Sequence, residues 1–149
     1  MECNLPNLMR ITSQTFQYTI QPRSLERNPI LEKMRCSLER ETKQSYNSVL
    51  VNLYEDENDH VPFHSDDEII FGVNPVIASV SFGETRRFQL RRKGGRGSRS
   101  ADFEISLRHG SLLTMSGKTQ KNWQHAIPKD ATKRSERINL TFRNIVQLH

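Results

Sequence analysis

The residues best suited to hold a metal ion in this sequence are a histidine and an aspartate separated by one residue, in His64-Ser65-Asp66. In an extended backbone, side chains two positions apart point to the same side, so this pair can share one cation. A third ligand must come from a distant strand, and His125 in the segment 123–127 is the natural candidate. Two imidazoles and one carboxylate form the facial triad of non-haem Fe(II) oxygenases, which leaves metal positions open for other ligands. The spacing therefore predicts an iron site.

A second set of polar residues alternates with apolar ones along the segments 48–54 and 137–143. The polar faces hold Asn52 and Tyr54 on the first segment, and Arg137, Asn139, Thr141 and Arg143 on the second. An antiparallel strand with one solvated face gives the same pattern. If both polar faces instead line the inside of a barrel, the buried guanidinium groups require an anion. Arginine forms bidentate hydrogen bonds to carboxylates, so the pattern then predicts a small polycarboxylate ligand.

Charge is unevenly distributed along the chain, which has 22 Lys and Arg against 17 Asp and Glu and a net charge of +5. The segment 86–99 contains no acid and seven basic residues: Arg86, Arg87, Arg91, Arg92, Lys93, Arg96 and Arg99. Such a concentrated positive field attracts phosphate groups. A solvated loop kept soluble by its charges is the alternative interpretation.

These candidate residues must be positioned by short strands. The chain of 149 residues is long enough for one domain. Asn28 and Pro29 predict the start of a helix over 29–41, whose apolar residues recur every four positions. A strand is possible over 16–20, and seven further strands are expected at Ser48–Tyr54, Val76–Phe82, Arg87–Arg91, Phe103–Leu107, Ser111–Ser116, Trp123–Ile127 and Arg137–Ile145. We therefore expect a mainly β fold, a sandwich or barrel with one N-terminal helix against it.

Several classes of protein are excluded by composition. No segment approaches the ~20 apolar residues that cross a bilayer. The first residues contain neither a basic leader nor an apolar core, and two cysteines, Cys3 and Cys36, cannot form a disulfide framework. We therefore expect an intracellular protein that does not enter a membrane.

Six motifs, in this order, resemble those of the AlkB family of Fe(II)/2-oxoglutarate dioxygenases, which dealkylate nucleobases. They are Asn52-Leu53-Tyr54, His64-Ser65-Asp66-Asp67-Glu68, Ala78-Ser79-Val80-Ser81-Phe82-Gly83, His109-Gly110-Ser111-Leu112-Leu113, Trp123-Gln124-His125 and Arg137-Ile138-Asn139-Leu140-Thr141-Phe142-Arg143. The resemblance runs from about residue 28 to 146 and is strongest to the branch with the human DNA and RNA demethylases. It implies a double-stranded β-helix, or jelly-roll, core.

The resemblance also implies a role for each matching residue. It implies Fe(II) bound by His64, Asp66 and His125, with 2-oxoglutarate and O2 as cosubstrates. The implied 2-oxoglutarate pocket consists of Asn52, Tyr54, Arg137, Asn139, Thr141 and Arg143. Asp67 matches the acid that reads the damaged base, Glu68 follows it in the same turn, and His64 offers a surface on which the base stacks.

The resemblance further implies a domain division and a substrate. Residues 1–27 correspond to a short N-terminal segment, a reduced nucleotide-recognition lid, and residues 28–149 to the catalytic core. Tyr18 is a candidate to stack on the base, with ordinary packing as the alternative. Alkylated DNA or RNA is the implied substrate, with single strands favoured, and we expect a monomer. Basic residues of the segment 86–99, including Arg91, Arg92, Lys93 and Arg96, would hold phosphates on a loop away from the iron.

Two other functions remain open at this point. The chain could be a non-catalytic nucleic-acid-binding module on the same fold, or a dioxygenase that acts on a protein or a small molecule. The intact set of candidate iron and 2-oxoglutarate residues disfavours the first, and the basic segment together with Asp67 and Glu68 disfavours the second.

Overall fold

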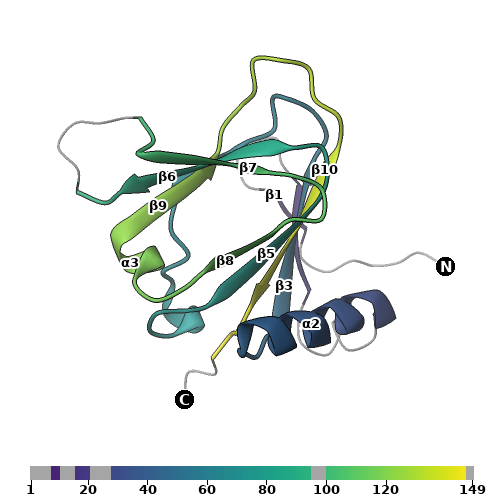
Figure 1. The fold of residues 1–149 in the computed structure, drawn as a ribbon, viewed down its shortest axis with the longest axis vertical. Coiled ribbons are helices and arrows are strands. Elements are labelled where there is room, and N and C mark those ends of the chain that lie inside the picture. Colours follow the sequence, from purple (N-terminus) through teal and green to yellow (C-terminus); the bar gives the residue numbers. More distant parts are fainter. Residues whose placement is uncertain (1–7, 11–15, 21–27, 95–99, 147–149) are drawn as a thin grey trace.

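The structure is a computed structural model that describes residues 8–10, 16–20, 28–94 and 100–146; of 8–10 and 16–20 it describes the backbone. Strands dominate the described chain (Figure 1). They are β1 (Leu8–Arg10), β2 (Phe16–Ile20), β3 (Ser48–Tyr54), β4 (Val61–His64), β5 (Ile77–Gly83), β6 (Arg86–Arg92), β7 (Phe103–Leu107), β8 (Leu112–Met115), β9 (Trp123–Ile127) and β10 (Arg137–Arg143). The helical elements are α2 (Pro29–Thr42), α3 (Thr119–Asn122) and a 3-10 turn at Ile69–Phe71.

The described strands form two antiparallel sheets. The larger has the order β1-β2-β3-β10-β5-β8, and the smaller has the order β4-β9-β6-β7. The two sheets lie against each other as the layers of a jelly roll, and the hairpin of β6 and β7 extends to one side (Figure 1). The predicted mainly β fold with one main helix is confirmed.

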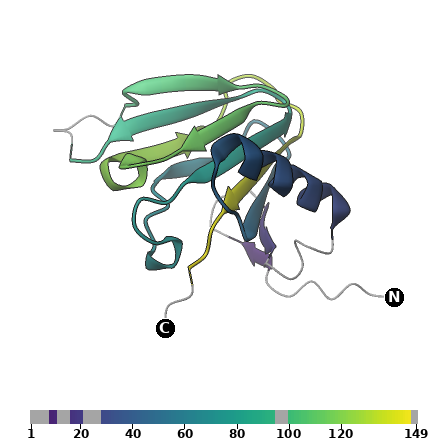
Figure 2. The same ribbon diagram turned by 60° about the horizontal axis from the view of Figure 1, so that its bottom comes forward.

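Helix α2 covers the outer face of the larger sheet (Figure 2). It begins where predicted: the Asn28 side chain accepts hydrogen bonds from the backbone N–H groups of Ile30 and Leu31, and Pro29 occupies the first turn. Its buried residues Leu31 and Leu38 pack against strand residues in a cluster that also contains Tyr46, Val49, Ala78, Val80, Leu140 and Phe142. This packing removes one face of the larger sheet from water and leaves the other face toward the smaller sheet.

Strand β10 lies at the centre of the larger sheet, between β3 and β5. Leu140 and Phe142 point to the helix, so the alternating residues Arg137, Asn139 and Thr141 point to the space between the sheets. On β3, which pairs with β10, Asn52 and Tyr54 line the same space. The polar faces of 48–54 and 137–143 are therefore internal faces, which excludes the solvated-strand interpretation.

The structure also contains elements that sequence patterns did not predict. Strand β4 is four residues long and contains Pro62. The proline, which has no N–H to donate, is tolerated because β4 is an edge strand of the smaller sheet. Strand β1 and the short helix α3 were likewise missed, and β10 ends at Arg143 rather than at Ile145. Among the described residues, the structure has no helix long and apolar enough to span a bilayer.

Candidate functional site

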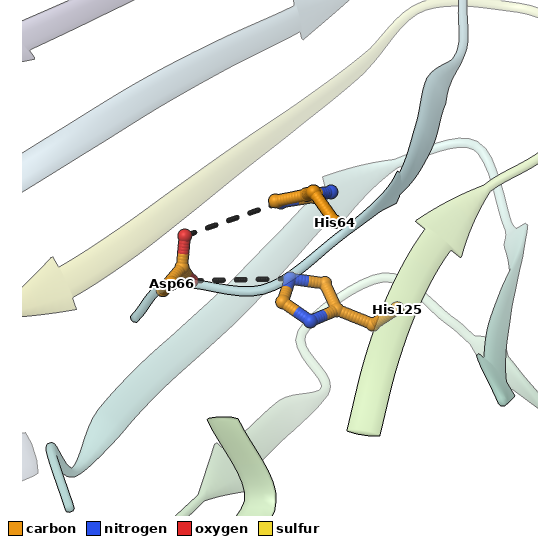
Figure 3. Close-up of side chains that lie close together, drawn as sticks. All are labelled: His64, Asp66 and His125. Atoms are coloured by element: carbon orange, nitrogen blue, oxygen red, sulfur yellow. Dashed lines mark ion pairs between the residues drawn. The ribbon is translucent and has the colours of Figure 1, made fainter. Parts of the chain in front are cut away.

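His64, Asp66 and His125 lie together between the two sheets (Figure 3). Strands β4 and β9 are paired so that His64 is directly opposite His125, and Asp66 follows in the turn after β4. One carboxylate oxygen of Asp66 is 4.0 Å from His64 Nε2, and the other is 3.8 Å from His125 Nε2. All three donor atoms lie within 4.8 Å of one another. The structure thus assembles the three residues that the sequence predicts as metal ligands.

Both imidazoles are oriented by their surroundings. His64 Nδ1 lies 2.9 Å from the carbonyl oxygen of Pro62, which can only accept a hydrogen bond, so the proton resides on Nδ1 and the Nε2 lone pair is free. The His125 ring is stacked on Phe88, with centroids 5.4 Å apart. Burial, with a smaller contribution from the neighbouring His64, lowers the pKa of His125 to about 4. His125 is therefore neutral at pH 7 and able to ligate a cation.

Asp66 is held from two sides. Its backbone N–H donates to Gln120 Oε1 at 2.9 Å, and its carboxylate accepts a hydrogen bond from Arg143 Nη2 at 3.1 Å. Gln120 belongs to α3, directly before β9, and is buried. The Ser65 hydroxyl donates to the carbonyl oxygen of Trp123 at 2.9 Å. The turn that carries Asp66 is therefore fastened to the segment that leads to His125.

Arg137 lies deeper in the same cavity and is 1% exposed. Its guanidinium group lies 4.8 Å from the centre of the Tyr54 ring, and Nη2 donates to the Ser81 hydroxyl at 3.0 Å. Within the described part of the chain, Arg137 Nε and Nη1 have no hydrogen-bond acceptor, and neither has Arg143 Nε. Burial lowers the pKa of the Arg137 guanidinium. These unpaired donors are costly to bury, so the cavity is suited to a carboxylate.

The remaining predicted pocket residues form a hydrogen-bond network beside Arg137. Asn139 Nδ2 donates to the Ser79 hydroxyl at 2.7 Å, and Asn139 Oδ1 accepts from the Thr141 hydroxyl at 2.9 Å. Asn52 Nδ2 lies 3.5 Å from the same oxygen, and Asn52 Oδ1 has no donor among the described residues. The cavity thus offers unpaired donors at its arginines and an unpaired acceptor at Asn52.

Together these groups fit the ions that the sequence predicts. Two imidazoles and a carboxylate suit a divalent transition metal. The unpaired N–H groups of Arg137 and Arg143 suit the carboxylates of 2-oxoglutarate, and Arg143 also touches Asp66, which connects the two parts of the cavity.

The basic segment 86–99 differs from the prediction in two respects. Arg86 is 1% exposed, and its guanidinium donates to the carbonyl oxygens of Asp56, Asp59 and Pro128, so it holds loops together and is not available to phosphate. Lys93 was expected on a loop away from the iron, but it lies beside the turn that carries the candidate metal ligand Asp66. Its ammonium group bonds to Asp67 Oδ2 and to the carbonyl oxygen of Gln120, each at 2.8 Å.

Other residues predicted to contact the substrate are spread over the site's surroundings. Asp67 and Glu68 are exposed in the turn after Asp66, and Lys93 lowers the pKa of Asp67 through their hydrogen bond. Arg91 lies over the Phe63 ring, and Arg92 is exposed at the end of β6. Arg96 lies outside the described residues. Tyr18 is paired with Val51 in the β2–β3 ladder, and its side chain lies outside what the structure describes.

Sequence reasoning missed two groups that complete the site. On β5, Ser79 lines the cavity and accepts from Asn139, and Ser81 accepts from Arg137. Their alternation with Ala78 and Val80 is a signal that could have identified them. Gln120 has no such signal, because its role depends on a four-residue helix that folds back onto the turn at Asp66.

The chain is similar to known proteins in fold and in sequence. A 19% identical solved structure, "The structure of OsALKBH1", covers 83% of this chain with a TM-score of 0.53, which shows a shared fold. The chain is 43% identical over 137 residues to the alpha-ketoglutarate-dependent dioxygenase alkB homolog 3 of Mus musculus, covering 86% of this chain and 48% of that protein. It is 42% identical over 122 residues to the DNA oxidative demethylase ALKBH2 of Homo sapiens, covering 79% and 47%.

The chain spans about half the length of these relatives. A family model for the 2OG-Fe(II) oxygenase superfamily matches residues 4–143. That match extends over nearly the whole chain and contains every candidate ligand of the cavity between the sheets. This chain therefore belongs to the 2OG-Fe(II) oxygenase superfamily.

Proposed function

We propose that this chain is the catalytic domain of an Fe(II)- and 2-oxoglutarate-dependent dioxygenase that removes methyl groups from nucleobases of the 1-methyladenine and 3-methylcytosine type. One observation carries the proposal: a three-residue metal site shares its cavity with buried arginine donors that lack an acceptor. Relatives named as an alkB homolog 3 dioxygenase and as a DNA oxidative demethylase support the choice of nucleic acid as substrate.

Each part of the cavity has a distinct task in this proposal. His64, Asp66 and His125 hold iron, and Arg137 pairs with the distal carboxylate of 2-oxoglutarate. Arg143 keeps Asp66 in place and lies near the end of 2-oxoglutarate that binds the metal. Bound iron, with 2-oxoglutarate and O2, supplies the oxidation of the N-methyl group, and the products are succinate, CO2, formaldehyde and the repaired base. The surrounding apolar residues, such as Phe88 and Ile127, keep bulk water out.

The substrate approaches from the exposed side of the metal site. The side chain of His64 is 39% exposed, whereas that of His125 is 9% exposed, so the target base stacks against His64. Asp67 then lies beside the base, with Glu68 next to it. A base must leave its stack to reach a buried site, and this costs least in a single strand. Single-stranded DNA or RNA is therefore the favoured substrate of a monomeric enzyme acting inside the cell.

A substrate panel tests the proposal. Purified protein with Fe(II) and 2-oxoglutarate is offered 1-methyladenine or 3-methylcytosine in single- and double-stranded DNA and RNA, and formaldehyde and succinate are quantified. We expect both products in equal amounts, with single strands preferred. His125→Ala should abolish turnover and iron retention, because the triad loses a ligand. The histidine control, His60→Ala, lies outside the cavity and should retain both. Full activity of His125→Ala with stoichiometric iron would refute the metal site.

A further inference from the structure

Two aromatic rings and an arginine form an exposed surface beside the metal site. We call this surface the aromatic ledge and define it as Phe103, Trp123 and Arg92. The rings of Phe103 and Trp123 have their centroids 5.5 Å apart, and the Arg92 guanidinium lies 5.7 Å from the centre of the Trp123 ring. Phe103 is 59% exposed, although aromatic side chains of this size usually bury most of their surface. Trp123 is half-buried and Arg92 is exposed, so the ledge presents the Phe103 ring, part of the Trp123 ring and a positive charge to solvent.

Strand registry places the aromatic ledge on the same face of the smaller sheet as the metal site. Trp123 precedes His125 by two residues on β9, so both side chains point to the same side, about 6.5 Å apart along the strand. Leu90 of β6 pairs with His125 on one side and with Phe103 on the other. The ledge thus continues the inner face of the sheet beyond His125, toward the end of β6 and the start of β7, where the two strands of the hairpin are connected (Figure 1).

The opposite face of the smaller sheet carries a second aromatic–arginine pair. Phe63 lies next to His64 on β4, and the Arg91 guanidinium lies 4.0 Å from the centre of its ring. Arg91 Nε also donates to Gln124 Oε1 at 2.9 Å. The Arg91 guanidinium is therefore already engaged by Phe63 and Gln124. Arg92 differs: among the described residues its guanidinium contacts Trp123 and forms no ion pair with a carboxylate.

From this arrangement we propose that the aromatic ledge binds the nucleotide next to the target base. Stacking of a base on aromatic rings together with a cationic group for the adjoining phosphate is how proteins hold single strands without reading their sequence. The ledge offers rings at Phe103 and Trp123, and Arg92 offers the charge. Its distance from His125 suits a neighbouring nucleotide, because the target base itself occupies the space beside His64. The proposal rests on the proposed function for the identity of the strand.

A single tryptophan makes the ledge directly observable. Trp123 is the only tryptophan of the chain, so all tryptophan fluorescence reports on the ledge. In the absence of 2-oxoglutarate, the protein is titrated with a five-nucleotide single strand that has 1-methyladenine at its centre. Matched strands lack the base on the 5′ or the 3′ side of it but keep every phosphate. We expect the intact strand to quench the fluorescence and one of the two abasic strands to quench it far less.

Variants test the same contact by affinity. Trp123→Leu and Phe103→Ala should each bind the intact five-nucleotide strand, now carrying a fluorescent label, roughly 5- to 150-fold more weakly than wild type does, as expected for the loss of base stacking. Trp123→Phe keeps an aromatic ring and should retain most of the affinity. Phe63→Leu removes a ring from the outer face and should bind as the wild-type protein does. A thermal unfolding curve for each variant separates lost stacking from lost folding.

The outcomes separate the ledge from the proposed function. Equal affinity of Trp123→Leu and wild type, or equal quenching by the intact strand and by both abasic strands, would overturn the ledge and leave demethylation standing. Quenching that depends on one flanking base, in a protein that releases no formaldehyde from any strand, would support the ledge and overturn the demethylase proposal.

Discussion

At the scale of single residues, the site is defined by groups whose hydrogen-bonding capacity the folded chain leaves unfilled. Arg137 is buried, yet two of its nitrogen atoms have no acceptor among the described residues. A buried charge without a partner costs free energy, and apolar residues that replace buried ion pairs often leave a protein as stable or make it more stable. Under the proposed function, Arg137 is kept for the carboxylate of 2-oxoglutarate, at the expense of the stability of the ligand-free protein.

Arg137→Met provides a test that separates ligand binding from folding. Without 2-oxoglutarate, we expect its free energy of unfolding to lie within about 1 kcal/mol of wild type or above it. Affinity for 2-oxoglutarate should fall roughly 10- to 150-fold, since a charged hydrogen bond contributes about 1.5–3 kcal/mol. At a 2-oxoglutarate concentration about 100 times the wild-type Kd, the wild-type protein should gain about 2.7 kcal/mol, or roughly 5–10 °C in Tm. At the same concentration Arg137→Met should gain only about 0.3–1.4 kcal/mol.

The control for Arg137→Met is Arg40→Met, which removes an exposed arginine from α2 and should keep the full 2-oxoglutarate shift. If Arg137→Met unfolds without ligand while Arg40→Met does not, Arg137 has a structural role and the ligand pocket must be sought elsewhere.

At the scale of elements, the metal residues depend on a short helix. Strands β4 and β9 align His64 with His125, but Asp66 lies beyond the end of β4 and needs another support. Helix α3 provides it: the Gln120 side chain accepts from the Asp66 backbone, and the Gln120 carbonyl oxygen accepts from Lys93, which also pairs with Asp67. A four-residue helix thereby sets the position of the carboxylate between the two imidazoles.

Gln120→Met should weaken the metal site without unfolding the protein. The variant keeps the side-chain volume and removes the acceptor for the Asp66 N–H, so the carboxylate loses its support. Loss of such an outer contact typically lowers metal affinity 10- to 100-fold. Titration with Mn²⁺ followed by electron paramagnetic resonance measures the affinity. Gln120→Glu retains an acceptor oxygen and should restore much of it, whereas the exposed control Gln44→Met should match wild type. Unchanged Mn²⁺ affinity in Gln120→Met would show that Asp66 needs no support from α3.

A loop before β10 is fastened by a carboxylate with a shifted pKa. Hydrogen bonds from Arg134 and Thr132 lower the pKa of Asp130 to about 2, and Arg87 lies 3.9 Å away. Because this pKa is lower in the folded protein than the ordinary 3.8, ionised Asp130 stabilises the fold above about pH 4. The contribution is lost as the pH falls from about 4 to 2.

Asp130→Asn should therefore be less stable than wild type at pH 6, and the difference should shrink to nothing between pH 4 and pH 2. Urea unfolding at pH 6, 4, 3 and 2 measures the difference in the free energy of unfolding. Glu41→Gln, which changes an exposed carboxylate of α2, serves as the control and should show no such trend. A difference that stays constant down to pH 2 would mean that the carboxylate charge does not stabilise the loop.

At the scale of the whole molecule, the net charge of +5 is concentrated near the hairpin of β6 and β7. The structure divides this cluster by task. Arg86 joins loops in the interior, Lys93 pairs with Asp67, and Arg92 remains exposed beside Trp123. Only part of the basic segment is therefore free to contact phosphate.

The salt dependence of single-strand affinity measures which basic residues contact phosphate. Replacement of Arg92 by glutamine should reduce the slope of log affinity against log salt for a single strand by roughly 0.7, the value of one lost phosphate contact. Affinity should fall to a similar extent for every sequence tested. Arg40→Gln, which lies on α2, should leave the slope unchanged. An unaltered slope in Arg92→Gln would assign the phosphate contacts to other lysines and arginines.

Much of this protein could be predicted from its sequence because the patterns are local. A strict alternation over 137–143 determines which of its side chains share a face, whichever strands lie beside them. The spacing of His64 and Asp66 identified both as ligand candidates, although Asp66 lies in the turn after β4. The cap at Asn28 and Pro29 determines where α2 begins. The predicted residues of the metal site and of the arginine-lined cavity could be named on those grounds.

Other features depended on contacts between distant segments, which local patterns do not contain. Arg86 and Arg92 have similar sequence surroundings, yet one is 1% exposed and the other lies on the surface, because three carbonyl groups from two loops enclose the first. Gln120 is more than 50 positions from Asp66 and supports it only because α3 folds back onto the turn after β4. The tertiary structure decided which charges serve the interior and which remain for a ligand, since burial and hydrogen-bond partners are properties of the folded chain.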